Sequence, residues 1–252
     1  MRTTAILNCK GGVAKTTTVL NMAAILARDY QKRVLAADAD SQANTTEFLG
    51  GVPAGASTMA DLLRRCDVNP VIRPSDIPGV SLLGADESLM DLDLSSVRSR
   101  KADVMALRNL LTQRCGDFDF CLIDCPPAFN AASAAALLAA DDVIIPIKPD
   151  AFSLRGMANI LRQIRNMQDI NPDLTIAGLL PTMVYRSEQI RRALDVLCLS
   201  DFRVFPSIRK TPKVDDMTFA QKPLVESSPN SAACVDYRRF VRVYLEGGAA
   251  HG

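Results

Sequence analysis

The chain has 252 residues, of which 48% are hydrophobic and 5% aromatic, so it is long enough to bury a sizeable, mainly aliphatic core. A formal net charge of +1 excludes a globally basic nucleic-acid-binding protein, although it allows a local basic patch. Seven cysteines without a C-x-x-C pair, together with a single histidine, give no metal-type spacing and indicate reduced thiols in a cytoplasmic protein.

Apolar runs alternate with helical patterns along the whole chain. The predicted strands are residues 4–8, 33–38, 80–84, 118–124, 142–147, 175–181 and 202–205. The predicted helices follow Lys15, Arg100, Ala131, Leu154, Glu188 and Asn230. This β-α-β alternation is typical of an α/β fold with a doubly wound, mostly parallel sheet flanked by helices. We expect a single domain over residues 1–252, with loops around one short helix at 50–80 and an exposed excursion at 85–100.

The first strand leads into NCKGGVAKTTT, residues 8–18, and then into a helical pattern. This arrangement suits a triphosphate, although the standard pattern G-x-x-x-x-G-K-[ST] would need glycine where Cys9 and Ala14 stand. Backbone N–H groups can turn inward around phosphates, Lys15 can reach the β- and γ-phosphates, and the Thr16 hydroxyl can bind Mg²⁺. The predicted nucleotide contacts here are Gly11, Gly12, Val13, Ala14, Lys15, Thr16 and Thr17. A chance glycine turn beside solvated lysines is the alternative for this motif alone.

Two later strands end in acidic residues. One buried strand ends in Asp38 and Asp40, whose spacing points both to one side, and Asp124 ends the apolar run FDFCLID. At the carboxyl edge of a parallel sheet, such residues face the ligand crevice. Asp124 is typical of a Walker B acid, and the other two can support Mg²⁺ and position the attacking water. Solvated acids at strand ends are the alternative for each motif alone, but three motifs in this order favour a nucleotide site.

The set of motifs resembles the ParA/MinD family of partition and positioning ATPases, in the deviant Walker A class of P-loop proteins. The matching segments are KGGVAKT at 10–16, DADSQAN at 38–44, LIDCPP at 122–127, IPIKPDAFSLRGM at 145–157 and KPLVESSPNSAACVDYRRF at 222–240. The resemblance therefore covers nearly the whole chain. The missing first glycine is normal in this family, whereas Ala14 departs from the commoner glycine.

The resemblance implies a role for each matching residue of the site. Lys15 and Thr16 take the phosphate and Mg²⁺ roles. Asp40 is the water-activating acid, Asp124 is the Walker B acid, and Asp38 is a supporting group near the metal. The implied cofactors are therefore ATP and Mg²⁺.

Lys10 matches the family's signature lysine, which reaches the nucleotide of a partner subunit. The resemblance thus implies an ATP-dependent homodimer that hydrolysis takes apart, with Lys10, Lys15 and Asp40 as catalytic residues. Adenine contacts are expected near Pro206.

The DNA-partition branch of the class fits best. The chain resembles the short ParA type, because the loop begins at residue 8 and no helix-turn-helix precedes it. This resemblance implies non-specific DNA binding, hydrolysis stimulated by a ParB-like centromere-binding protein, and a cytoplasmic, nucleoid-associated location. The alternative is a MinD-like switch that positions a membrane or protein partner. We expect no stable membrane association, because residues 231–252 indicate a packed helix with a tip of small residues.

Residues 182–213 carry seven basic and three acidic residues, a net charge of +4 in a chain whose total is +1. The predicted DNA contacts are Arg186, Arg191, Arg192, Arg209, Lys210 and Lys213. We expect the last three to lie in an outward-facing, Pro-bounded loop. Contacts to phosphate would make DNA binding salt-sensitive and indifferent to sequence. A solvated surface that only keeps the protein soluble is the alternative.

Overall fold

The computed structural model describes residues 1–64, 72–99 and 102–248. A seven-stranded sheet runs through it in the order β3-β4-β2-β5-β1-β6-β7. The strands are β1 (Arg2–Ile6), β2 (Val34–Asp38), β3 (Arg73–Pro74), β4 (Val80–Leu83), β5 (Phe120–Asp124), β6 (Asp142–Ile147) and β7 (Thr175–Pro181). Neighbouring strands are parallel except β3 and β4. The predicted doubly wound, mostly parallel sheet is therefore confirmed.

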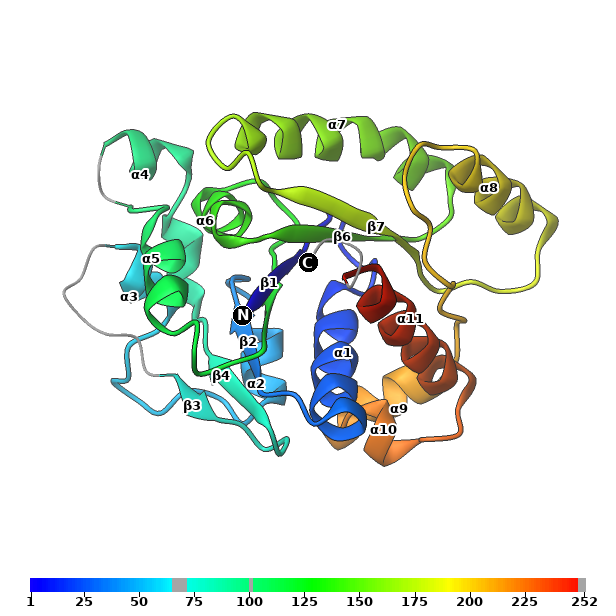
Figure 1. The fold of residues 1–252 in the computed structure, drawn as a ribbon, viewed down its shortest axis with the longest axis horizontal. Coiled ribbons are helices and arrows are strands. Elements are labelled where there is room, and N and C mark those ends of the chain that lie inside the picture. The colour runs from blue at the N-terminus through cyan, green and yellow to red at the C-terminus, as the bar shows by residue number, and fades with distance from the viewer. Residues whose placement is uncertain (65–71, 100–101, 249–252) are drawn as a thin grey trace.

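Helices cover both faces of the sheet, with α1 and α11 on one face and α6 and α7 on the other (Figure 1). The helices are α1 (Lys15–Tyr30), α2 (Asn44–Phe48), α3 (Met59–Leu63), η1 (Glu87–Asp91, 3₁₀), α4 (Leu94–Arg98), α5 (Ala106–Gln113), α6 (Ala131–Ala139), α7 (Ala151–Gln168), α8 (Glu188–Cys198), α9 (Lys213–Ala220), α10 (Leu224–Ser227) and α11 (Ala232–Gly248). None of the described helices has the length and apolarity needed to cross a membrane.

Two apolar layers form because successive side chains of a strand point to opposite faces. In β1, Ala5 packs into the layer under α6, whereas Ile6 packs into the layer under α1. The central strands are buried on both faces, which explains their almost continuous apolar sequence.

Three details of the sequence prediction are wrong. Residues 202–205 form no strand, and Val204 makes only an isolated bridge to Leu179, since the next donor on β7 would be Pro181, which has no N–H to give to the Phe205 carbonyl. Residues 85–99 are no exposed excursion, because η1 and α4 bring Leu89 and Leu92 into the core. The short strand β3 and the helices α2, α9 and α10 were not predicted.

The strand order reverses at β1. The chain leaves β1 through α1 toward β2 on one side, and leaves β5 through α6 toward β6 on the other. A crevice at the carboxyl edge of an open α/β sheet forms where the connections diverge in this way, and ligands bind there.

Candidate functional site

The predicted phosphate loop lies at this carboxyl edge, between β1 and α1. Asp124 of β5 is in register with Ile6 of β1 on one side and with Asp38 of β2 on the other. The Ala39 N–H donates to the Asp124 carbonyl at 2.9 Å, which continues the pairing beyond β2. The sheet therefore brings the glycine loop, Asp38 and Asp124 together.

The loop contains two left-handed residues. Gly12 has φ 68°, and Ala14 has φ 67° and ψ 35°. The left-handed conformation disfavours a residue with a Cβ atom by about 1–2 kcal/mol, so Ala14 is strained where glycine would not be. A Cβ atom built on Gly11 or Gly12 would meet nothing within 4 Å. The space over the turn is thus open to a ligand.

Lys15 folds back over this turn. Its ammonium lies 3.4 Å from the Lys10 carbonyl oxygen, and the residue is 7% exposed. Asn8 shapes the start of the loop, because its amide donates to the Pro146 carbonyl at 2.7 Å and its oxygen accepts the Lys10 N–H at 2.9 Å. An ammonium held here can reach phosphates that lie on the loop N–H groups.

Asp124 is the centre of a polar cluster beside Thr16. Its Oδ2 accepts hydrogen bonds from the hydroxyls of Thr16 at 2.7 Å and Thr45 at 2.8 Å. Its Oδ1 is buried and has no hydrogen-bond partner in the described part of the chain. Burial raises the pKa of Asp124 to about 6. A carboxylate oxygen without a partner beside a threonine hydroxyl is a donor set that Mg²⁺ accepts, so these residues fit the predicted ion.

Asp38 has a different environment, because both of its oxygens are engaged within the protein. Its Oδ1 accepts the Asp40 N–H at 3.0 Å, and its Oδ2 accepts the Thr46 N–H and hydroxyl, both at 2.8 Å. Burial first, and the charge of Asp124 second, raise the pKa of Asp38 to about 7. Asp38 therefore fastens the segment after β2 to the sheet, and its predicted contact with the metal stays a prediction.

A cavity of about 350 Å³ lies over the loop. The residues that line it are Gly11, Gly12, Ala14, Lys15, Thr16, Thr17, Asp40, Gln42, Asn44, Pro127 and Met183. Of the two acids in the DADSQAN motif, Asp40 is therefore the one that borders this cavity. Its Oδ1 accepts the Gln42 N–H at 3.0 Å. A carboxylate in this place can orient a water toward a phosphate on the loop.

A second, mostly apolar cavity of about 360 Å³ shares Ala14, Thr17 and Met183 with the first. Its other lining residues are Thr182, Tyr185, Ile208, Arg209, Lys210, Thr211, Pro212, Val214, Asp215 and Tyr237. An apolar cavity beside a phosphate loop suits a nucleobase. Pro206, the predicted adenine contact, does not line this cavity. The segment around Pro206 is hydrogen-bonded along β7, and residues 208–212, which follow it, line the cavity instead.

The Lys10 side chain binds an acid away from Lys15. Its ammonium lies 2.9 and 3.0 Å from the two carboxylate oxygens of Asp150, just after β6. The Lys148 ammonium is 4.0 Å from the same carboxylate. The structure therefore separates the two lysines of the motif, and only Lys15 borders the cavity over the loop.

All six predicted DNA contacts are exposed, as expected. Arg191 and Arg192, however, share the carboxylate of Glu188, at 2.8 and 3.1 Å. Arg186 and Lys210 form no ion pair with the described residues.

Two further cations of this surface meet acids from outside residues 182–213. Arg209 binds both oxygens of Asp236 at 2.8 Å, and Lys213 lies 2.8 Å from Asp216. Including these two acids lowers the local net charge from +4 to +2. Lys213 is also the first residue of α9, so its predicted place in a loop is wrong.

Sequence reasoning missed several hydroxyl residues of the site. Thr45 and Thr46 directly follow the DADSQAN motif, and this position was the available signal. Thr18, Thr182 and Tyr237 also contact the loop or line its cavities, but they carry no motif of their own.

Comparisons with known proteins agree with this geometry. A family model described as an AAA domain matches residues 1–176. The chromosome partitioning protein ParA of Caulobacter vibrioides is 31% identical over 251 residues, which cover 96% of this chain and 93% of that protein. The sporulation initiation inhibitor protein Soj of Bacillus subtilis is 34% identical over 183 residues, 71% of this chain and 72% of that protein.

Two solved structures with bound nucleotides are also similar. Cobyrinic acid a,c-diamide synthase from Mycobacterium smegmatis, with a bound ATP analogue and magnesium, is 32% identical with a TM-score of 0.85, over 100% of this chain and 97% of that one. The septum site-determining protein MinD of Pyrococcus horikoshii, complexed with Mg-ADP, is 25% identical with a TM-score of 0.78, over 100% and 98% of the two chains. The chain therefore belongs to the ParA/MinD family of P-loop ATPases, as its motifs predicted.

Proposed function

We propose that the chain is a DNA-partition ATPase that binds Mg-ATP at the carboxyl edge of the sheet. The observation that carries the proposal is the buried Oδ1 of Asp124, which lacks a partner among the described residues and lies beside the Thr16 hydroxyl and the open glycine turn. This place can accept a cation and offers N–H groups to an anion, as a magnesium-bound phosphate requires. The nucleotides bound by the similar structures support the same reading.

The residues of this site divide the work of phosphoryl transfer. Thr16 and Asp124 would hold Mg²⁺, which when bound neutralises charge on the β- and γ-phosphates. The loop N–H groups and Lys15 hold the phosphates, and Asp40 orients the attacking water. The base occupies the apolar cavity between Met183 and residues 208–212. Of these assignments, only the placement of the base does not follow from the sequence motifs.

Dimerisation couples this chemistry to a switch. Lys10 leaves Asp150 and reaches the nucleotide of a second copy, so that ATP holds the dimer together and hydrolysis releases it. A ParB-like partner accelerates the release. The dimer binds DNA phosphates through its exposed cations, and the single domain carries all of these activities.

Contacts of α11 favour partition over a MinD-like membrane switch. Tyr237, Phe240, Val241 and Tyr244 of this helix are buried in the layer shared with α1. The apolar side of the described part of α11 is thus already covered by the protein. An amphipathic membrane helix instead needs a free apolar side.

Calorimetry tests the nucleotide site. We expect the parent to bind ADP with Mg²⁺ and Lys15→Ala to lose that binding, whereas Lys222→Ala, at an exposed lysine outside both cavities, should keep it. Equal affinity of the Lys15→Ala variant and the parent would refute the assignment.

A charge-reversal pair tests the DNA surface. Arg186→Glu, next to α8, should weaken DNA binding in the presence of ATP and reduce its salt dependence. Arg98→Glu makes the same charge change at an exposed position on α4, at the opposite end of the molecule (Figure 1), and should have little effect. If the two variants bind DNA equally well, the surface lies elsewhere.

A further inference from the structure

The left-handed Ala14 requires an explanation, because no glycine stands there to adopt the conformation without strain. It lies directly before α1 and lines both cavities of the site. A residue with a Cβ atom stays in this region only where its surroundings determine the conformation.

Two buried hydroxyls hold the peptide groups on either side of Ala14. The Thr182 hydroxyl donates to the Val13 carbonyl at 3.1 Å. The Thr18 hydroxyl donates to the Ala14 carbonyl at 2.7 Å, and this oxygen also accepts the Thr18 N–H at 3.0 Å. Because each peptide group is planar, fixing both groups restricts the two dihedral angles of Ala14 between them.

Tyr237 supports the second of these contacts. Its hydroxyl lies 3.3 Å from the Thr18 Oγ1. Thr18 has one hydroxyl proton and donates it to Ala14, so the Tyr237 hydroxyl must be the donor to Thr18. Thr18 is 0% and Tyr237 1% exposed, and burial raises the pKa of the Tyr237 phenol, which keeps its proton.

We propose that Tyr237 and Thr182 are positioning residues that keep Ala14 left-handed and thereby keep the phosphate loop ready for nucleotide. The proposal rests on the proposed function, in which this loop holds the phosphates. With these two residues in place, Ala14 keeps the left-handed conformation that a glycine at residue 14 would adopt without strain. Both also line the apolar cavity, so the base and the phosphate loop are supported by the same side chains.

This role predicts that the need for Tyr237 depends on the residue at position 14. Without its hydroxyl, Ala14 should spend more time outside the left-handed region, and the apparent affinity falls with the fraction of competent loop. Glycine adopts the left-handed region freely, so a loop with the Ala14→Gly substitution should not need the support. A direct contact between Tyr237 and the base would instead be lost equally in both backgrounds.

A double-mutant cycle measures this dependence. We would determine the dissociation constant of ADP with Mg²⁺ by calorimetry for the parent, Tyr237→Phe, Ala14→Gly and the double variant. Tyr237→Phe should weaken binding about three- to tenfold, the value of one net hydrogen bond. The double variant should bind as tightly as Ala14→Gly alone. Thr182→Val should show the same pattern.

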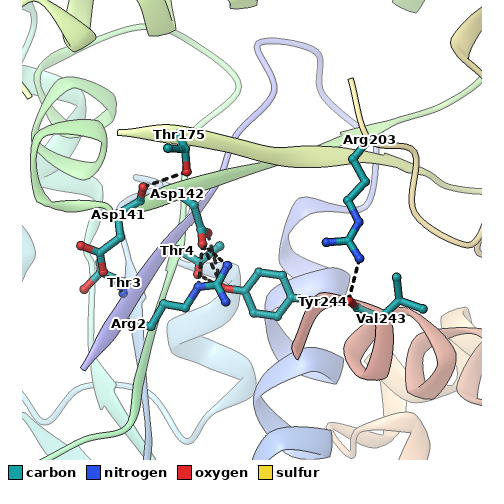
Figure 2. A network of polar contacts seen from close by, with 9 residues as sticks. All are labelled: Arg2, Thr3, Thr4, Asp141, Asp142, Thr175, Arg203, Val243 and Tyr244. Atoms are coloured by element: carbon teal, nitrogen blue, oxygen red, sulfur yellow. Dashed lines mark hydrogen bonds and ion pairs between the residues drawn. The ribbon is translucent and has the colours of Figure 1, made fainter. Parts of the chain in front are cut away.

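Tyr244→Phe is the matched control, because it removes the other buried tyrosine hydroxyl of α11. Figure 2 shows Tyr244 with Thr4 and Asp142, and its hydroxyl lies 2.6 Å from the Thr4 Oγ1. This variant should lower the melting temperature and leave ADP affinity unchanged. Equal loss from Tyr237→Phe in both backgrounds, or an equal loss from Tyr244→Phe, would overturn the positioning role alone. Failure of the parent to bind ADP would overturn the proposed function as well.

Discussion

The ion pair between Lys10 and Asp150 should oppose dimerisation. In the proposed dimer, Lys10 has to leave this carboxylate before it can reach the nucleotide of the other subunit. Asp150→Asn removes the charge that holds Lys10 and keeps the size of the side chain. We therefore expect this variant to form the ATP-dependent dimer more readily than the parent.

The size of the effect follows from the exposure of the pair. The Lys10 and Asp150 side chains are 38% and 27% exposed, and an ion pair open to solvent contributes about 1 kcal/mol or less. Two pairs break in each dimer, so the gain is at most about 2 kcal/mol, or roughly thirtyfold in the dimer dissociation constant. Salt should reduce it, because screening weakens exposed pairs.

Sedimentation of each variant with a non-hydrolysable ATP analogue measures the dimer constant directly. Asp119→Asn is the matched control, since it breaks the exposed pair between Asp119 and Arg33 at the opposite edge of the sheet. Lys10→Ala/Asp150→Asn tests whether the gain acts through Lys10, and it should form no more dimer than Lys10→Ala alone. An Asp150→Asn dimer no tighter than that of the parent would refute the reasoning.

Four further outcomes are expected. Asp40→Ala should keep its affinity for Mg-ATP and release phosphate at least about a hundredfold more slowly, and a parental rate would exclude Asp40 as the water-orienting acid. Thr46→Val should lower the melting temperature by about 5 °C, because Asp38 loses a buried hydrogen bond and the buried Ala85 N–H loses its acceptor. Burial raises the pKa of Asp124 to about 6 and of Asp38 to about 7, so the ligand-free protein should lose stability as the pH rises from about 4 through about 7. Because both carboxyls are ionised above this range, Mg-ADP should raise the melting temperature more at pH 8 than at pH 5.5, and a pH-independent rise in Asp124→Asn would support Asp124 as the group responsible.

The parts of the site that sequence predicted best come from contiguous segments. The order of strand, glycine turn, Lys15 and helix is local, and Asp124 stands at a strand end whose neighbours the parallel sheet fixes. Register then places Asp38 beside Asp124 without further information. The motifs could not show that both carboxylate oxygens of Asp38 accept hydrogen bonds from the segment after β2, because that depends on where Thr46 lies in three dimensions.

The errors arise where distant segments meet. Arg209 is exposed as expected, but the sequence did not indicate that Asp236, 27 residues away, binds it with both carboxylate oxygens. Pro206 was placed at the adenine by resemblance, whereas residues 208–212 line the cavity because two isolated bridges hold this segment along β7 and beyond. The support of Ala14 comes from Thr182 and Tyr237, and nothing in the local sequence of the loop indicates either residue.

Backbone strain separates structural from functional positions in this protein. Five described residues other than glycine have positive φ. Gln31 and Gln221 end α1 and α9, where a left-handed residue is the common way to close a helix.

The other three, Ala14, Ala43 and Met183, surround the site. Ala43 precedes α2 in the segment that Asp38 fastens, and Ala14 and Met183 line both cavities. At about 1–2 kcal/mol each, this strain costs the fold several kcal/mol that glycine would largely avoid. Each of the three lies in a different element: the phosphate loop, the segment bearing Asp40, and the chain beyond β7. Gln42 and Asn44, the neighbours of Ala43, also line the cavity over the loop. A nucleotide bound in these cavities would therefore bridge the three elements, and its binding energy could offset part of this strain.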